Sequence, residues 1–193
     1  MQKGRIEAFS DGVLAIIITI MVLELKVQHG TALADLQPLA PVFFSYVLSF
    51  IYVGIYWNNH HHMLHAARTI TGPIMWANLH LLFWLSIVPF ATAWMGENHF
   101  AAVPVALYGA VLIMNAIAYT ILATLLVRHE GLGSALALAM GRDRKGKLSL
   151  VMYAVAILAA FWRPLAALAL YVTVAAVWFI PDRRIERVLT PAD

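Results

Sequence analysis

Six long apolar stretches, separated by short polar or charged connections, dominate the pattern of this chain. A transmembrane helix needs about 20 mostly apolar residues to cross a hydrocarbon core of about 30 Å. The pattern therefore predicts an all-α integral membrane bundle of six transmembrane helices, forming a single domain over residues 1–193. The predicted spans are 9–25, 39–57, 74–94, 101–127, 148–162 and 165–180.

The last two stretches are short, and only Arg163 and Pro164 separate them. A single helix over residues 148–180 would be about 50 Å long at a rise of about 1.5 Å per residue, much longer than the hydrocarbon core. Proline favours a turn or the first position of a helix. The sequence therefore predicts a tight hairpin of two short helices.

The distribution of Lys and Arg predicts the orientation. If the amino terminus is cytoplasmic, only Lys26 and Arg163 of the 13 Lys and Arg residues lie on the outer side, which is the positive-inside bias of membrane proteins. We therefore expect a multi-pass protein of the cell membrane with both termini in the cytoplasm. The basic residues on the predicted inner side are Lys3, Arg5, Arg68, Arg128, Arg142, Arg144, Lys145, Lys147, Arg183, Arg184 and Arg187.

Composition narrows the class of function. Hydrophobic residues make up 62% of the chain and charged residues 12%, and the mean hydropathy is +0.79, so little sequence remains for a soluble domain. The absence of cysteine excludes disulfides, thiolate catalysis and iron–sulfur chemistry. Because we find no plausible catalytic constellation, we expect no enzymatic activity, no cofactor and no nucleic-acid partner.

The first apolar stretch carries the residues that are most costly to place in lipid. Arg5, Glu7, Ser10 and Asp11 lie at or just inside its cytoplasmic end. Charges inside a span require a partner or a function. Asp11 could be a helix-start acid favoured by the macrodipole, or it could belong to a buried polar network.

Helical geometry divides this first stretch into two faces. At about 100° per residue, an aliphatic stripe centred on Ile16 forms one face, and Asp11 points about 140° away from it. From periodicity alone, a stripe that simply faces lipid or packs in a core is the favoured interpretation. The stripe consists of Gly12, Val13, Ile16, Thr19, Ile20 and Leu23.

The second stretch ends in a histidine-rich cluster on the same predicted side of the membrane. We expect one of these histidines to donate a hydrogen bond to Asp11, with Trp57 packed over the pair. The spacing also suits a transition-metal site, or haem ligation together with His80. Without cysteine and with a single nearby acid, we expect no bound metal. The cluster consists of Trp57, Asn58, Asn59, His60, His61, His62 and His65.

The start of the chain contains the pattern R-x-x-x-F-S-D, followed by GVLAIIIT and, at the end of the stretch, LEL. This pattern resembles the first-helix signature of the lysosomal potassium channel family, transmembrane protein 175, in its prokaryotic form. The pairing of Trp57 with His60 is similar to the partner motif in that family's second helix, and the six-span length is similar to its single-repeat bacterial members. The motif residues of the first helix are Arg5, Phe9, Ser10 and Asp11.

The resemblance implies a potassium-selective or potassium-preferring cation channel, in which four six-helix subunits form a homotetramer around one pore. Its partners would be the lipid bilayer, other copies of the chain, and potassium and related monovalent cations. By position, the family's hydrophobic constriction falls on Ile16, Thr19, Ile20 and Leu23 of the first helix. The interlock that holds this helix falls on Arg5, Phe9, Ser10, Asp11, Trp57 and His60.

An alternative from another class is a proton- or metal-coupled membrane transporter. In that interpretation Asp11 and the cluster from His60 to His65 would form the relay. We find neither the broken helices nor the internal inverted repeat that would favour it.

Overall fold

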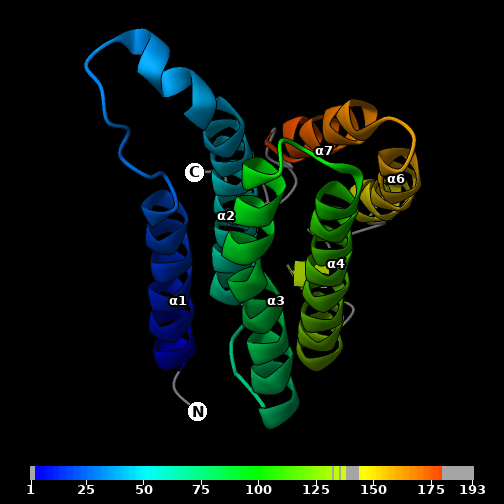
Figure 1. Cartoon of the computed structure of the whole chain (residues 1–193). Coiled ribbons are helices and arrows are strands. Elements are labelled where there is room, and N and C mark those ends of the chain that lie inside the picture. Colours follow the sequence, from blue (N-terminus) through cyan, green and yellow to red (C-terminus); the bar gives the residue numbers. More distant parts are fainter. Residues whose placement is uncertain (1–2, 132, 135, 138–143, 180–193) are drawn as a thin grey trace, which may run out of the picture.

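The computed structural model describes residues 3–131, 133–134, 136–137 and 144–179, and within them every regular element is a helix (Figure 1). The basic residues of the predicted cytoplasmic tail lie outside the described residues. The helices are α1 (Lys3–Leu23), η1 (Leu33–Leu39), α2 (Ala40–Ala66), α3 (Gly72–Glu97), α4 (Ala102–Glu130), α6 (Arg144–Ala160) and α7 (Pro164–Phe179).

The predicted all-α membrane bundle is confirmed. Four segments of the described chain are long and apolar enough to cross a membrane: Lys3–Leu23, Leu33–Ala66, Gly72–Glu97 and Ala102–Glu130. At 17 and 16 residues, α6 and α7 are only about 25 Å long. That both cross the membrane therefore stays a prediction.

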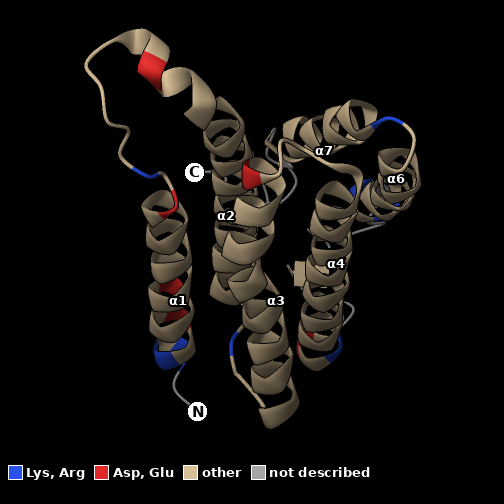
Figure 2. Ribbon diagram, in the orientation of Figure 1, with Lys and Arg blue, Asp and Glu red and all other residues tan. Residues whose placement is uncertain are grey.

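The helix boundaries differ from the predicted spans in an understandable way. The first helix begins at Lys3, six residues before the predicted span, because helical structure continues beyond the apolar run. The predicted hairpin is present, since α6 ends at Ala160 and α7 begins at Pro164. Charged residues are concentrated at the helix ends and in the connections, except on α1 (Figure 2).

The third helix is the centre of the bundle and packs against α1, α2 and α4 (Figure 1). The α6–α7 hairpin covers α4, and α7 also reaches α2. Where α2 begins and α3 ends, the two helices approach so closely that a Cβ atom on Gly96 would lie 2.8 Å from the Cα of Val42. This arrangement leaves α1 at the edge of the bundle, where, among the described helices, it packs against α2 and α3.

The interior combines apolar side chains with hydroxyl groups that bond to one another. Ser49, Thr92 and Tyr108 join α2, α3 and α4, with 2.6 Å between Thr92 Oγ1 and Ser49 Oγ and 3.0 Å between Ser49 Oγ and the Tyr108 hydroxyl. All three residues are buried. Such bonds satisfy groups that could find no water in a hydrocarbon core.

Candidate pore-lining helix and its anchoring network

The first helix has one buried face and one exposed face. The buried residues recur every three or four positions, which is the period of a single helical stripe. They are Ile6, Ser10, Leu14, Ile17 and Met21. This face fixes α1 against α2 and α3, and no described part of the chain covers the opposite face.

The uncovered face is the aliphatic stripe expected from the sequence. Ile16 is 58% exposed and Leu23 77%, and Thr19 and Ile20 are also exposed. The Thr19 hydroxyl donates to the backbone oxygen of Ile16 at 2.9 Å, so its lone pairs remain free to accept. A helix that presents four such residues outwards needs another surface to cover them or a pore to line.

A buried chain of three polar side chains anchors the other face. Asn78 of α3 donates through Nδ2 to the Ser10 hydroxyl at 3.0 Å, and its Oδ1 lies 2.6 Å from Nε2 of His60 on α2. The carbonyl oxygen of Asn78 can only accept, so His60 is the donor. All three residues are buried. Asn78 therefore joins the first three helices at a single point.

Asn78 was not among the predicted site residues, although its position in an apolar stretch was a sign of its role. Asn78 and His80 are the strongly polar residues in the first half of the apolar stretch 74–94. A buried amide in such a stretch requires partners. Periodicity could not indicate that these partners would come from α1 and α2.

The prediction that a histidine donates a hydrogen bond to Asp11 is wrong. The indole nitrogen of Trp57 donates to Asp11 Oδ1 at 3.0 Å, whereas His60 turns towards Asn78. Asp11 and Ser10 are neighbours in sequence and so point about 100° apart around α1. Asp11 consequently meets the exposed flank of α2, and Ser10 meets the buried junction with α3.

The start of α1 is tied to the end of α2 by a residue that the sequence analysis did not single out. Lys3 Nζ donates to the backbone oxygen of His65 at 2.7 Å and lies 3.7 Å from a Glu7 carboxylate oxygen. Arg5 and Phe9, which were expected in the interlock, are instead exposed on the first turns of α1. Within one chain, the structure does not bring them to the Ser10 junction.

The remaining histidines form a stacked row at the end of α2. The His61 ring stacks between Trp57 and His65, with ring centroids 6.0 Å apart on each side, and His62 meets His61 edge-on at 5.6 Å. Among the described residues, no group of three or more His, Cys, Asp or Glu side chains is arranged to hold a metal ion. The His80 ring instead accepts a hydrogen bond from the Trp84 indole at 2.9 Å.

The carboxyl-terminal half of α1 borders an open groove of about 590 Å³ against α3. Ile16 and Ile20 contribute from α1, Glu24 contributes from the position just after this helix, and Phe90 and Trp94 contribute from α3. The groove is largely apolar except near Glu24 and Glu97. The helix therefore offers two surfaces for contact, the stripe itself and this flank.

An ion pair lies at the Glu97 end of the groove. Lys26 Nζ lies 3.0 Å from Oε1 of Glu97, which joins the connection after α1 to the end of α3. The hydrogen bond and the charge of Glu97 raise the pKa of Lys26 above its ordinary value. Both side chains are exposed, so water and salt weaken the attraction.

Several known proteins and one family model are similar in sequence to this chain. The model of the family described as "Endosomal/lysosomal potassium channel TMEM175" matches residues 5–89. A protein named as a potassium channel in Chryseobacterium sp. (strain P1-3) is 57% identical over 189 residues, covering 98% of each chain. Another named potassium channel, from Streptomyces collinus, is 34% identical over 126 residues, covering 61% of each chain.

A solved structure is similar over nearly the whole chain. The crystal structure of a lysosomal potassium-selective channel TMEM175 homolog from Chamaesiphon minutus matches with a TM-score of 0.80 and 27% sequence identity. The match covers 93% of this chain and 97% of the other. The region matched by the family model, residues 5–89, contains the exposed stripe of α1 and the Ser10–Asn78–His60 junction.

Proposed function

Because this chain belongs to the endosomal/lysosomal potassium channel TMEM175 family, we propose that it is a potassium-selective or potassium-preferring cation channel. It is a multi-pass membrane protein, and membership of a channel family accords with the expected lack of enzymatic activity. Four copies surround one pore in the cell membrane, with both termini in the cytoplasm. The exposed stripe of α1 lines the pore.

The observation that carries this proposal is the division of α1 into an anchored face and an uncovered face. The Ser10–Asn78–His60 junction fixes how the helix is rotated, so that Ile16, Thr19 and Leu23 point away from the subunit. One such helix cannot enclose a path for ions. A closed ring of identical subunits can, because rotation about the axis brings each stripe to the centre.

Two rows of exposed aromatic side chains flank α1 and support a ring of contacts between subunits. The rows recur every seven residues, so each stays on one helix face, as in helices that pack at a small angle. They are Phe43, Phe50 and Trp57 on α2, and Trp76, Phe83 and Phe90 on α3.

The two rows lie on opposite flanks of α1. Trp57 bonds to Asp11, whereas Phe90 shares the outer groove with Ile20. Asp11 and Ile20 are nine residues apart and so point about 180° from each other. In a closed ring with head-to-tail contacts, the α2 row of one subunit meets the α3 row of the next.

The composition of the stripe supports selection by dehydration. A ring of Ile16 side chains offers a passing ion no ligands to replace its water, so passage is harder for the ion that holds water more strongly. That ion is sodium. Thr19, one turn further along, places an oxygen that can accept beside the constriction. The same apolar ring closes the pore when it narrows enough to lose water.

The contacts of the polar residues do not favour the alternative of a coupled transporter. An indole N–H, which does not titrate, occupies the position beside Asp11 where a relay would need an imidazole. His60 is bonded to an amide rather than to an acid. The junction is built as a fixed anchor between helices.

Two measurements on purified protein test the proposal. Native mass spectrometry in mild detergent should give a tetramer, and potassium flux into liposomes should exceed sodium flux under equal gradients. A monomer as the sole species, or equal flux of both ions through an intact tetramer, would contradict the assembly or the selectivity, respectively.

A further inference from the structure

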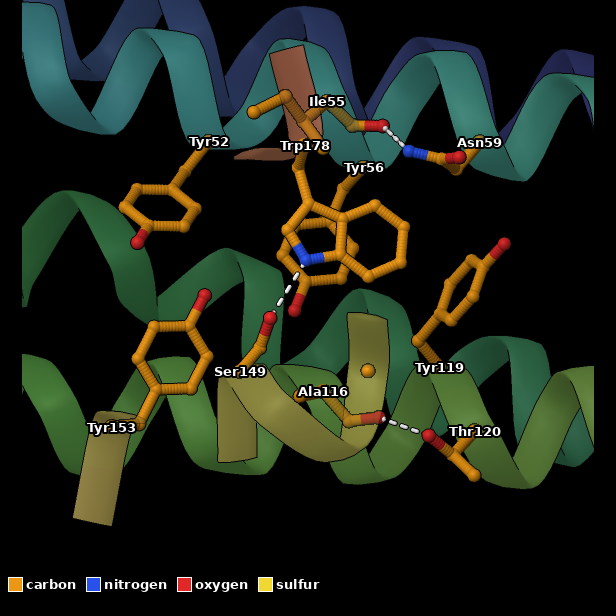
Figure 3. A pocket seen from close by; sticks show the side chains of 11 residues that line it. Tyr52, Ile55, Tyr56, Asn59, Ala116, Tyr119, Thr120, Ser149, Tyr153 and Trp178 are labelled. Carbon is orange, nitrogen blue, oxygen red and sulfur yellow. Dashed lines mark hydrogen bonds between the residues drawn. The ribbon is translucent and has the colours of Figure 1, made fainter. Parts of the chain in front are cut away.

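A small cavity lies between α2, α4, α6 and α7, on the far side of α2 from the pore-lining helix (Figure 3). Its volume is about 40 Å³, which is room for about three water-sized groups. Aromatic rings form most of its wall, with Tyr52 and Tyr56 on α2, Tyr119 on α4, Tyr153 on α6 and Trp178 on α7. These rings present an apolar surface to whatever enters.

The polar groups of the wall are largely occupied by bonds within the protein. Ser149 Oγ donates to the backbone oxygen of Lys145 at 2.8 Å and accepts from the Trp178 indole at 2.8 Å. Thr120 Oγ1 donates to the backbone oxygen of Ala116 at 2.8 Å. A polar ligand would find few free donors here, so the cavity favours an apolar group.

The cavity extends to the lipid-facing side of α4. Thr120, which lines it, is exposed together with Ile117 and Ile121 on the same helix. An apolar space open to the bilayer is filled most readily by hydrocarbon. Because the space is small, a single linear chain fits it better than a branched or polycyclic molecule.

A basic turn of α6 lies at the entrance. Gly146 lines the cavity, and its neighbours in sequence are Lys145 and Lys147, of which Lys147 is exposed. Lysines at the start of a membrane helix extend towards the headgroups, where each contributes to binding of anionic lipid. A chain in the cavity would therefore place its headgroup beside positive charge.

We propose that the cavity takes the last few carbons of one acyl chain of an anionic phospholipid, while the rest of the chain lies along the exposed face of α4 and the headgroup rests against the basic first turn of α6. The inference rests on the proposed orientation, which places this lipid in the cytoplasmic leaflet. The cavity and the anchor share about one and a half turns of α2, since Tyr56 and Asn59 line the cavity and Trp57 and His60 hold α1. A bound chain therefore braces the part of α2 that fixes the pore-lining helix.

The test measures lipid retained by the purified full-length protein. The protein is incubated with equal amounts of dioleoyl phosphatidylglycerol and dioleoyl phosphatidylcholine, and the bound lipid is counted by native mass spectrometry. We expect one retained lipid per subunit, with the anionic lipid preferred about five-fold. Lys147→Gln should remove most of this preference, while Arg163→Gln, on the opposite side of the membrane, should leave it unchanged.

Two further variants test the cavity itself. Ala116→Phe fills the space and Thr120→Phe blocks its entrance, so either one should abolish retention of both lipids. Ile117→Phe, on the same helix but outside the cavity, is the matched control and should retain them. Equal retention of the two lipids by the original protein, or full retention by Thr120→Phe, would overturn the proposal. A protein that gave either result yet conducted potassium would leave the proposed channel function intact.

Discussion

Helices α2 and α3 present a different surface from α4, α6 and α7. Large exposed side chains on α2 and α3 are mostly aromatic, whereas those on α4, α6 and α7 are mostly aliphatic, such as Ile117, Val155 and Val172. Aliphatic side chains suit lipid, and aromatic side chains are enriched where proteins meet. The contrast accords with the proposal that the first half of the chain forms the subunit contacts and the pore, and the second half the lipid boundary.

The buried amides of the two halves differ in the same sense. Asn78 uses both ends of its side chain to join α1 and α2. Asn115 of α4 donates at 3.0 Å to the backbone oxygen of Val111 in its own helix and makes a longer contact of 3.5 Å to that of Trp84 on α3, and its Oδ1 has no hydrogen-bond partner among the described residues. A buried amide therefore fixes helix positions most firmly where both ends of its side chain make short bonds to other helices.

The largest expected effect is the difference in stability between two variants, each of which replaces one of these amides with leucine. Asn78→Leu leaves the Ser10 hydroxyl and the His60 ring buried without their partner, so the free energy of unfolding should fall by about 2 kcal/mol. Asn115→Leu is the matched change on α4, and it should be neutral or slightly stabilising because it removes an unsatisfied acceptor. Thermal melting of both variants in detergent measures the difference. Equal melting temperatures for the two variants would contradict the proposed difference between the two buried amides.

A smaller effect is expected from shortening one exposed side chain in each half. Phe83→Ala removes a ring from the proposed contact between subunits and should weaken the tetramer by about 1–2 kcal/mol per interface. Val155→Ala shortens a side chain that faces lipid and should leave assembly unchanged. Dilution followed by native mass spectrometry reports the tetramer fraction. Loss of tetramer in Val155→Ala, with none in Phe83→Ala, would reverse the assignment of the two surfaces.

The smallest effect is expected at the outer ion pair. Because Glu97 raises the pKa of Lys26, the pair stabilises the folded protein below the ordinary lysine pKa of 10.5 and loses this contribution as the pH rises through the raised value. Both side chains are exposed, so the change should be slight. Melting temperatures between about pH 9 and about pH 12 should therefore converge for the original protein and Lys26→Gln. A difference that grew with pH would contradict this sign.

The sequence predicted the elements well because each depends on a local pattern. Apolar runs long enough to cross a membrane gave the helices, and Pro164 marked the hairpin. The exposed stripe around Ile16 also followed from local periodicity. What the stripe faces was not a local property, and only the resemblance to a family suggested a pore.

Partners in the anchoring network could not be predicted from pattern alone. Asp11 and His60 were expected to bond, but the donor to Asp11 is Trp57 and the acceptor for His60 is Asn78. Which polar groups meet depends on how three helices are rotated against one another. A rotation of one residue, about 100°, is enough to exchange Ser10 for Asp11 at the junction.

The most direct test of whether the stripe of α1 lines the pore is the reversal potential of Ile16→Asn under bi-ionic potassium and sodium conditions. If Ile16 rings the pore, four amides hydrate the constriction and supply oxygen ligands, so the tetramer should conduct more and prefer potassium less. Ile121→Asn, which places the same amide on the lipid-facing side of α4, should lower stability and leave the preference unchanged. An intact Ile16→Asn tetramer with the original reversal potential would contradict the account, because the stripe of α1 would then not line the path of the ion.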